Sequence, residues 1–229
     1  MTPSRRVIWQ ATSDGGNCWP HSAARQWHGR SWRARSSRCW LWDISTFTPL
    51  GAKRLGLLHE LIPKAERVAA FINPNSAIAE PLIREAHAGA SNIGWQVEVV
   101  HASTIRDIDV AFASLEQKRA DAVFVSADQF FATRRVQFAT LATHYRVPAV
   151  YSYRAFPEVG GLMSYGPNLP DQYRQLGAYT GRMLNGEKPA ELPVRAPTKF
   201  ELVINLGTSK TLGLTIPPGL LVAADEAIE

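Results

Sequence analysis

Short apolar segments alternate with amphipathic segments along most of this chain, and this rhythm limits the folds it can adopt. The predicted strands are residues 67–72, 96–100, 121–125, 148–152 and 162–165. The predicted helices are residues 53–61, a segment that ends near Ala88, a segment from the capping box at Thr104 to about Lys118, and residues 133–144 and 171–184. Such alternation predicts an α/β fold with a doubly wound, mostly parallel sheet.

The first 42 residues differ in composition from the rest of the chain. They contain seven arginines, one acidic residue and six of the seven tryptophans, so they carry a net charge of +6, and the remainder carries −1. A basic face for nucleic acid should extend over the whole domain, so we expect no nucleic-acid partner. Residues 1–44 are interpreted as an atypical, disordered and dispensable leader that resembles an out-of-frame or wrongly started translation. A nucleic-acid-binding arm and an ordered extension are the alternatives.

The sequence gives little sign of export or of membrane insertion. Arg5 and Arg6 provide the positive start of a secretory leader, but residues 7–17 are too polar for its apolar core. No run approaches the roughly 18 apolar residues of a membrane-spanning helix, so an integral membrane protein is not expected. Cys18 and Cys39 alone cannot form a disulfide framework or a four-cysteine zinc site.

Polar and aromatic residues follow the predicted strands, where ligands bind in parallel α/β sheets. The candidate ligand-binding residues are Asn73, Asn75, Ser76, Asp128, Tyr151, Ser152, Tyr153 and Tyr165. They suit a small molecule, and the first turn lacks a phosphate loop or dinucleotide fingerprint, so no cofactor is expected. The isolated histidines (His59, His87, His101 and His144) have no metal-ligand spacing, so no metal is expected either.

Each candidate can be given a role. Asn75, Ser76 and the helix amides behind them are suited to a carboxylate, Asp128 to an ammonium group, and the tyrosines to the walls. In the alternative interpretation, Asn73, Asn75 and Ser76 only cap one helix and Asp128 only caps the next.

Several segments, in this order, resemble one known family. They are residues 53–63 (KRLGLLHELIP), 67–69, Asn73-Pro74-Asn75, Tyr151-Ser152, 160–168 (GGLMSYGPN) and 197–206 (PTKFELVINL). Together they resemble the ABC-transporter substrate-binding proteins of the type I periplasmic-binding fold, in the tryptophan/tyrosine-binding-like branch. The resemblance covers about residues 45–229.

That resemblance implies a two-lobed protein that closes on its solute. Residues 53–155 would form the second lobe, 160–186 would cross to the first lobe, and 198–229 would return, with the first lobe largely missing. It implies a non-enzymatic, periplasmic substrate-binding component, or a non-functional remnant of one, which binds a small amino-acid-like solute and has a transporter permease as partner. As written, the chain lacks a convincing signal peptide, so a cytoplasmic location is the alternative.

Two other functions compete with solute binding. A receiver-like phosphoacceptor domain would use Asp128 and Ser152, but Asn73-Pro74 stands where an acidic pair should hold magnesium. A hydrolase triad would use Ser152, His144 and Asp128, but the sequence Tyr-Ser-Tyr lacks the glycines of a nucleophile elbow.

Overall fold

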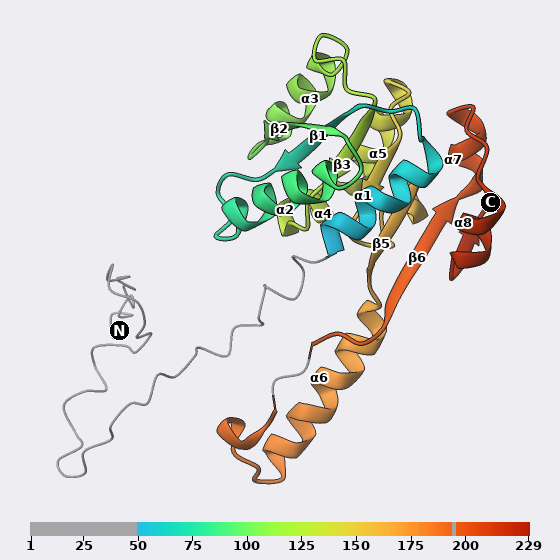
Figure 1. The fold of residues 1–229 in the computed structure, drawn as a ribbon. Helices are drawn as coiled ribbons and strands as arrows, with labels where there is room; N and C mark the ends of the chain where they lie inside the picture. The colour runs from blue at the N-terminus through green and yellow to red at the C-terminus, as the bar shows by residue number, and fades with distance from the viewer. Residues whose placement is uncertain (1–49, 194–195) are drawn as a thin grey trace, which may run out of the picture. The chain divides into compact units, whose positions relative to one another are not determined.

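The computed structural model describes residues 50–193 and 196–229, so the expected leader lies outside the described residues. Within the described residues, one seven-stranded sheet has the order β2-β1-β3-β4-β5-β6-β7 (Figure 1). Its strands are β1 (Arg67–Ile72), β2 (Gln96–His101), β3 (Ala122–Val125), β4 (Ala149–Tyr151), β5 (Met163–Pro167), β6 (Phe200–Asn205) and β7 (Glu226–Ile228). The helices are α1 (Leu50–Leu61), α2 (Ala79–Ser91), α3 (Ile105–Ser114), α4 (Gln129–Thr133), α5 (Arg135–His144), α6 (Leu169–Leu184), α7 (Leu206–Thr211) and α8 (Pro218–Ala223), with 3₁₀ turns at Pro157–Val159 and Pro189–Glu191.

The sheet is mostly parallel, as the sequence predicted. Only β5 and β6 pair antiparallel; the other neighbouring strands are parallel. In the register near the β2 edge of the sheet, Phe71 of β1 lies opposite Val100 of β2 and Val125 of β3. The parallel pairs arise because a helical crossover returns the chain to the same end of the sheet after each of the first strands.

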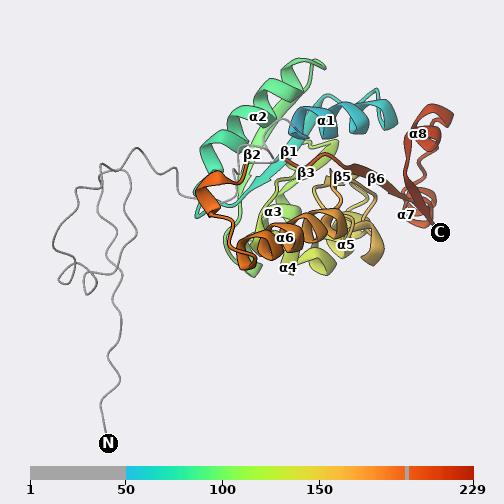
Figure 2. The same cartoon turned by 90° about the horizontal axis from the view of Figure 1, so that it is seen from below.

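Helices cover both faces of the sheet, with α1 and α2 on one side and α3 and α5 on the other (Figure 2). Side chains alternate along β1, so Val68 and Ala70 join the core under α1 and α2, and Ala69 and Phe71 join the opposite core. Strand β1 is therefore buried on both faces, which explains its continuous apolar sequence.

Two helices differ from the prediction. Helix α2 begins at Ala79, after a turn, and its N-cap residue Ile78 makes no side-chain capping bond. Helix α5 agrees with the helix predicted at residues 133–144, but the short helix α4 before it, capped by Asp128, was not predicted. The capping box at Thr104 and Asp107 is confirmed.

Helix α6 extends away from the body of the sheet (Figure 1). It follows β5, and the chain then returns through β6, which pairs with β5. Several of its apolar side chains are exposed, including Tyr173, Leu176, Met183 and Leu184. The helix thus contributes little to either described core.

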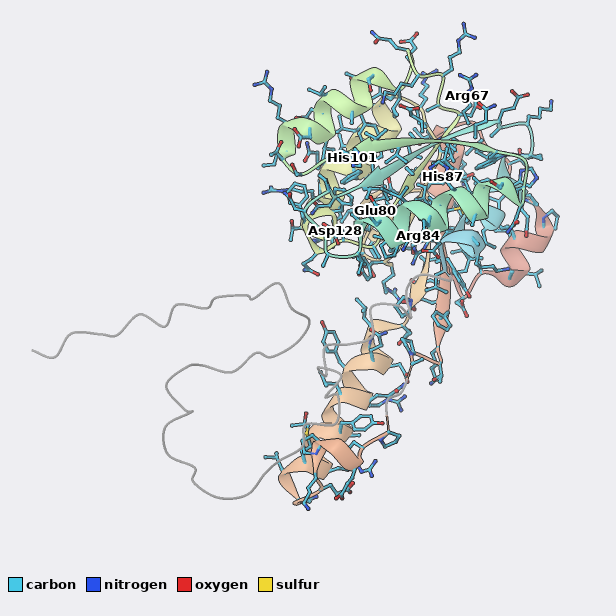
Figure 3. All side chains as sticks on the ribbon, turned by 60° about the vertical axis from the view of Figure 1, so that its left-hand side comes forward. Arg67, Glu80, Arg84, His87, His101 and Asp128 are labelled. Carbon is cyan, nitrogen blue, oxygen red and sulfur yellow. The ribbon has the colours of Figure 1, made fainter. Side chains whose placement is uncertain are left out.

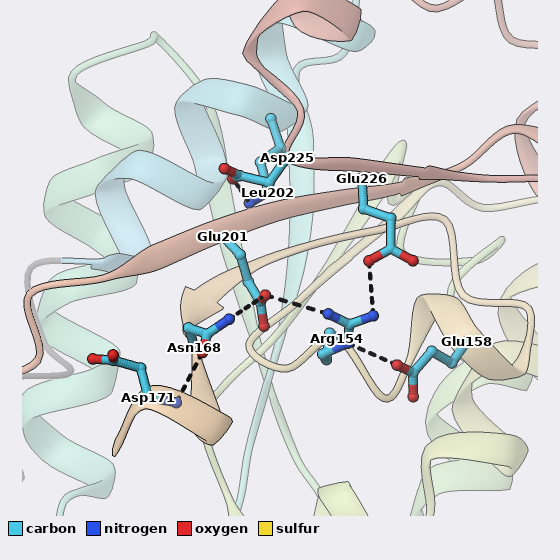
Figure 4. A network of polar contacts seen from close by, with 8 residues as sticks. All are labelled: Arg154, Glu158, Asn168, Asp171, Glu201, Leu202, Asp225 and Glu226. Atoms are coloured by element: carbon cyan, nitrogen blue, oxygen red, sulfur yellow. Dashed lines mark hydrogen bonds and ion pairs between the residues drawn. The ribbon is translucent and has the colours of Figure 1, made fainter. Parts of the chain in front are cut away.

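A polar network holds the sheet together where α6 leaves it (Figure 4). Arg154 donates to Glu158 over 2.7 Å, to Glu226 over 2.8 Å and to Glu201 over 3.4 Å. Glu201 also accepts from Asn168, which caps α6 through its bond from the amide of Asp171. These three carboxylates raise the pKa of Arg154, chiefly through the bond to Glu158.

Candidate functional site

The candidate residues gather at the carboxyl end of the parallel strands. Asp128 follows β3 and lies at the opposite end of the body from Arg67, which begins β1 (Figure 3). Helix α1 ends close to where β1 begins, so the first turn of α1 lies at the opposite end, beside the carboxyl ends of the strands. This is the end where ligands bind in open α/β sheets.

Asn73 and Asp128 are in direct contact there. The Asn73 side-chain amide donates to both carboxylate oxygens of Asp128, at 3.2 Å each. Asp128 Oδ1 also accepts from the backbone amides of Phe130, at 2.8 Å, and Phe131, at 3.3 Å. Asp128 is therefore the N-cap of α4, while among the described residues Oδ2 has only the bond from Asn73 and keeps free acceptor capacity.

The turn after Asn73 uses several of its own polar groups. Asn73 Oδ1 accepts from the amide of Asn75, and the carbonyl of Asn73 accepts from the amide of Ser76. Asn75 is exposed and Ser76 is half-buried. Residues 73–76, the expected helix cap, therefore form a closed turn. Helix α2 begins three residues after Ser76, and no side chain caps it.

Tyr151 and Ser152 are buried rather than open to the end of the sheet. Tyr151 stacks on Phe156 with ring centroids 4.4 Å apart, and burial raises the pKa of its hydroxyl. Ser152 Oγ donates to the carbonyl of Val125 over 3.4 Å. Both side chains occupy interior positions in this structure.

Tyr153 and Tyr165 are half-buried; Tyr153 follows β4 and Tyr165 lies within β5. Burial is the main cause that raises the pKa of Tyr153; the Arg54 charge acts against this rise, and Asp128 and Tyr173 add to it. Tyr165 stacks on Phe200 with a centroid distance of 6.2 Å.

Arg54 is a buried charged residue that the sequence analysis did not single out. Its side chain in α1 is 0% exposed, and Nε donates to the carbonyl of Tyr165 over 2.7 Å. Its Nη1 and Nη2 have no hydrogen-bond partner among the described residues. Burial is the main cause that lowers the pKa of Arg54 to about 10. A signal was present, because Arg54 falls on the same helical face as Leu57, Leu58 and Leu61.

Glu85 of α2 lies close to Arg54 but has another partner. Glu85 Oε1 accepts from the amide of Gly51 over 2.6 Å, so this carboxylate caps the start of α1. Burial raises the pKa of Glu85 to about 6, although the Gly51 bond and the Arg54 charge act against this rise. Within the described residues, no ion pair within 4.0 Å joins Glu85 to Arg54.

Other functions find less support in the geometry. Ser152 follows the end of β4, whereas the exposed His144 ends α5, just before β4 begins. The serine and the histidine of the suggested triad therefore lie at opposite ends of β4. Across residues 50–193 and 196–229, no three His, Cys, Asp or Glu residues gather closely enough to hold a metal ion. No helix in this part of the chain is long and apolar enough to cross a membrane.

Comparison with known proteins identifies the class. A family model for the ABC transporter substrate binding protein matches residues 48–228. The chain therefore belongs to the family of ABC-transporter substrate-binding proteins, as the sequence segments indicated, and the receiver-like alternative does not describe it. A search of curated proteins found no match.

Three solved structures share the fold. The ABC domain from Streptococcus pneumoniae in complex with L-Trp is 25% identical with a TM-score of 0.71, over 78% of this chain and 60% of that one. A conserved domain protein from Vibrio cholerae is 23% identical with a TM-score of 0.72, over 77% and 60%. A ligand-free, open substrate-binding protein from Clostridium difficile is 22% identical with a TM-score of 0.57, over 77% and 59%. The chain thus spans about 60% of the length of these proteins.

Proposed function

We propose that this chain is the substrate-binding component of an ABC-type importer and binds a small, amino-acid-like solute without chemical conversion. Its partner would be the transporter permease, and its location the periplasm, as in other members of the family. The similar Streptococcus pneumoniae structure was solved with L-Trp, which makes an amino acid the first solute to test.

The observation that carries this proposal is the convergence of polar groups beyond β1 and β3. The Asn73–Asp128 pair presents a carboxylate oxygen with free acceptor capacity, and the half-buried Tyr153 follows β4, the strand beside β3. Fixed polar groups beside aromatic walls are typical of small-molecule sites. From the candidate set we retain Asn75, Ser76 and Tyr165 as contacts at the rim, and Tyr151 and Ser152 as buried support.

We further propose that residues 53–155 act as the second lobe, that residues 160–186 with α6 cross toward the first lobe, and that residues 198–229 with β6 and β7 return to the second lobe. A ligand held against one lobe stays partly hydrated, so binding by this chain should be weak, with a dissociation constant of roughly 1 mM. A remnant without function would show no solute binding at all.

Ligand-observed NMR on the full 229-residue chain tests the proposal, because this method detects millimolar affinities. We expect saturable binding of at least one amino acid, and weaker binding by Asp128→Ala. The matched control is Asp109→Ala on the exposed side of α3, distant in sequence from every candidate residue. If neither amino acids nor other small organic solutes bind at tens of millimolar, the proposal is wrong.

A further inference from the structure

Helix α6 has a mostly apolar side that the described residues leave open to solvent. We call this side the α6 seam; it consists of Leu169, Tyr173, Leu176, Thr180 and Met183. Tyr173 is 69% exposed, Leu176 42% and Met183 38%, and the neighbouring Leu184 is 83% exposed. Single exposed apolar side chains are common, but a row of them along one helix indicates an interaction surface.

The opposite side of α6 is already occupied by the chain itself. The segment that returns from α6 to β6 runs along it: the Tyr179 hydroxyl donates to the carbonyl of Pro193 over 2.7 Å, and Lys199 Nζ lies 3.5 Å from Asp171 Oδ1. A shallow hollow between the helix and this segment is lined by Asp171, Arg174, Gln175, Ala178, Thr198 and Lys199. None of these residues belongs to the α6 seam, so the seam remains available to a partner.

The spacing of the α6 seam suits another helix. Its residues recur at intervals of four, three, four and three, which is the repeat of helices that pack side by side at a small crossing angle. This pattern is nearly symmetric about Leu176, so it is almost unchanged when the helix is reversed. An antiparallel second copy would place Leu176 opposite its own counterpart and Leu169 opposite Met183. The bulky Tyr173 would lie opposite the smaller Thr180.

Charge does not oppose such self-pairing. The charged residues of α6 are Asp171, Arg174 and Arg182, and at about 100° per residue all three project from the side opposite to the α6 seam. Arg182 is already paired with Glu187 over 2.6 Å. Two copies therefore bring no like charges together along the seam, and antiparallel packing places opposite ends of the two helix dipoles side by side.

We propose that α6 is a homodimer contact, in which two copies of this chain pair antiparallel along the α6 seam about a two-fold axis at Leu176. This inference goes beyond solute binding and does not depend on it. A two-fold contact uses the same surface on both copies, as the symmetric spacing requires. Helix α6 stands away from the sheet (Figure 1), so an antiparallel pair keeps the two sheets at opposite ends of the contact.

The size of the contact predicts a weak dimer. Helix α6 has 16 residues and is therefore about 24 Å long. One helix pair of this length buries roughly half of the ~800 Å² per partner that is typical of a stable interface. We therefore expect mostly monomer at low micromolar concentration and a growing dimer fraction from roughly 100 µM upward.

Sedimentation velocity on the full 229-residue chain, from about 1 µM to about 1 mM, tests the association. Leu176→Glu places two like charges at the two-fold axis and should weaken dimerisation at least about tenfold. The matched control is Val222→Glu, which changes an 88% exposed apolar residue of α8 and should leave the association unchanged. A wild-type chain that stays monomeric over this range overturns the inference, and so does a dimer that Leu176→Glu leaves intact.

Cysteine cross-linking tests the direction of the two helices. The background is the full chain with Cys18→Ser and Cys39→Ser, which removes the native thiols. Leu176→Cys should form an intermolecular disulfide on mild oxidation, because residues at the axis come within disulfide reach. Met183→Cys should not, because antiparallel pairing places the two copies of residue 183 about 20 Å apart. Equal cross-linking at positions 176 and 183 would mean parallel helices and would overturn the inference.

A different occupant of the α6 seam gives its own result. If the wild-type chain is monomeric, and Leu176→Glu lowers its melting temperature while Val222→Glu does not, then another segment of the same chain covers the seam. That result would also overturn the inference.

Discussion

The side-chain amide of Asn73 lies 3.2 Å from each carboxylate oxygen of Asp128, which ties the turn after β1 to the turn after β3. The two strands are neighbours in the sheet, so the contact joins two loops that are 55 residues apart in sequence. Asp128 thereby serves both as a helix cap and as a member of the candidate site. These two functions can be separated experimentally.

Asp128→Ala should destabilise the chain by about 1–2 kcal/mol, because it removes the cap of α4 and leaves the Asn73 amide without its acceptor. Asp128→Asn keeps an oxygen for the cap and should cost less. Urea unfolding of the two variants measures the difference. Equal losses would mean that the charge of Asp128, rather than its capping oxygen, stabilises α4.

Gly166→Ala should be among the most damaging single changes. A β-carbon built at Gly166 would lie 1.9 Å from the carbonyl oxygen of Ser152, a backbone atom that cannot move without displacing β4. We expect a loss of about 3 kcal/mol or more in the free energy of unfolding. In Gly177→Ala the new methyl group would meet nothing within 4 Å, and within α6 it should stabilise by about 0.5–1 kcal/mol. A tolerated Gly166→Ala would mean that β4 and β5 are further apart than described.

The raised pKa of Glu85 predicts a specific pH dependence of stability. Burial raises this pKa from 4.5 to about 6, so between these values the folded chain holds the proton that the unfolded chain has released. The stabilising contribution is therefore complete below about pH 4.5 and is lost as the pH rises through about 6. Glu85→Gln should remove this pH-dependent loss in the free energy of unfolding. The loss should be less than about 2 kcal/mol, because Glu85 is only half-buried and its charge is partly screened by solvent.

Denaturation of wild type and Glu85→Gln from pH 4 to 7.5 measures the effect as a difference between the two curves. The exposed Glu116→Gln serves as the control for the loss of a surface carboxylate. A Glu85→Gln curve that runs parallel to wild type would contradict the prediction.

Amide hydrogen exchange should be slowest in β1 and β3, which are buried on both faces, and much faster in α6. Exchange through local opening costs less where few buried contacts are lost, and most α6 side chains are exposed. Mass spectrometry after exchange can follow the peptides that cover 67–72, 122–125 and 171–184. Slowest exchange in α6 would show that the proposed division into lobes is wrong.

Much of the fold followed from local patterns. The apolar runs set the strands because parallel strands are buried on both faces, and the capping box at Thr104 set the start of α3. The short helix α4 and the late start of α2 were missed because they depend on how turns pack, which no residue period records.

The candidate site was predicted less completely. From the sequence we predicted that Asn73, Asp128 and Tyr153 lie at the same edge of the sheet, because the ends of parallel strands converge there. The burial of Arg54 was not predicted, because a single arginine in a helix is usually at the surface. Its position on the leucine face of α1 was the sequence signal, and its contact with the carbonyl of Tyr165, 111 residues away, required the tertiary fold.

The antiparallel pairing of β5 with β6 makes the intervening segment a replaceable module. The ladder runs from Met163–Ile204 to Pro167–Phe200, so the two ends of the α6 excursion leave the sheet side by side. Closing a long loop costs only about 0.6 kcal/mol more for each doubling of its length. An engineered chain could therefore carry a short hairpin, or a foreign domain with adjacent termini, between Pro167 and Phe200 and keep the same sheet.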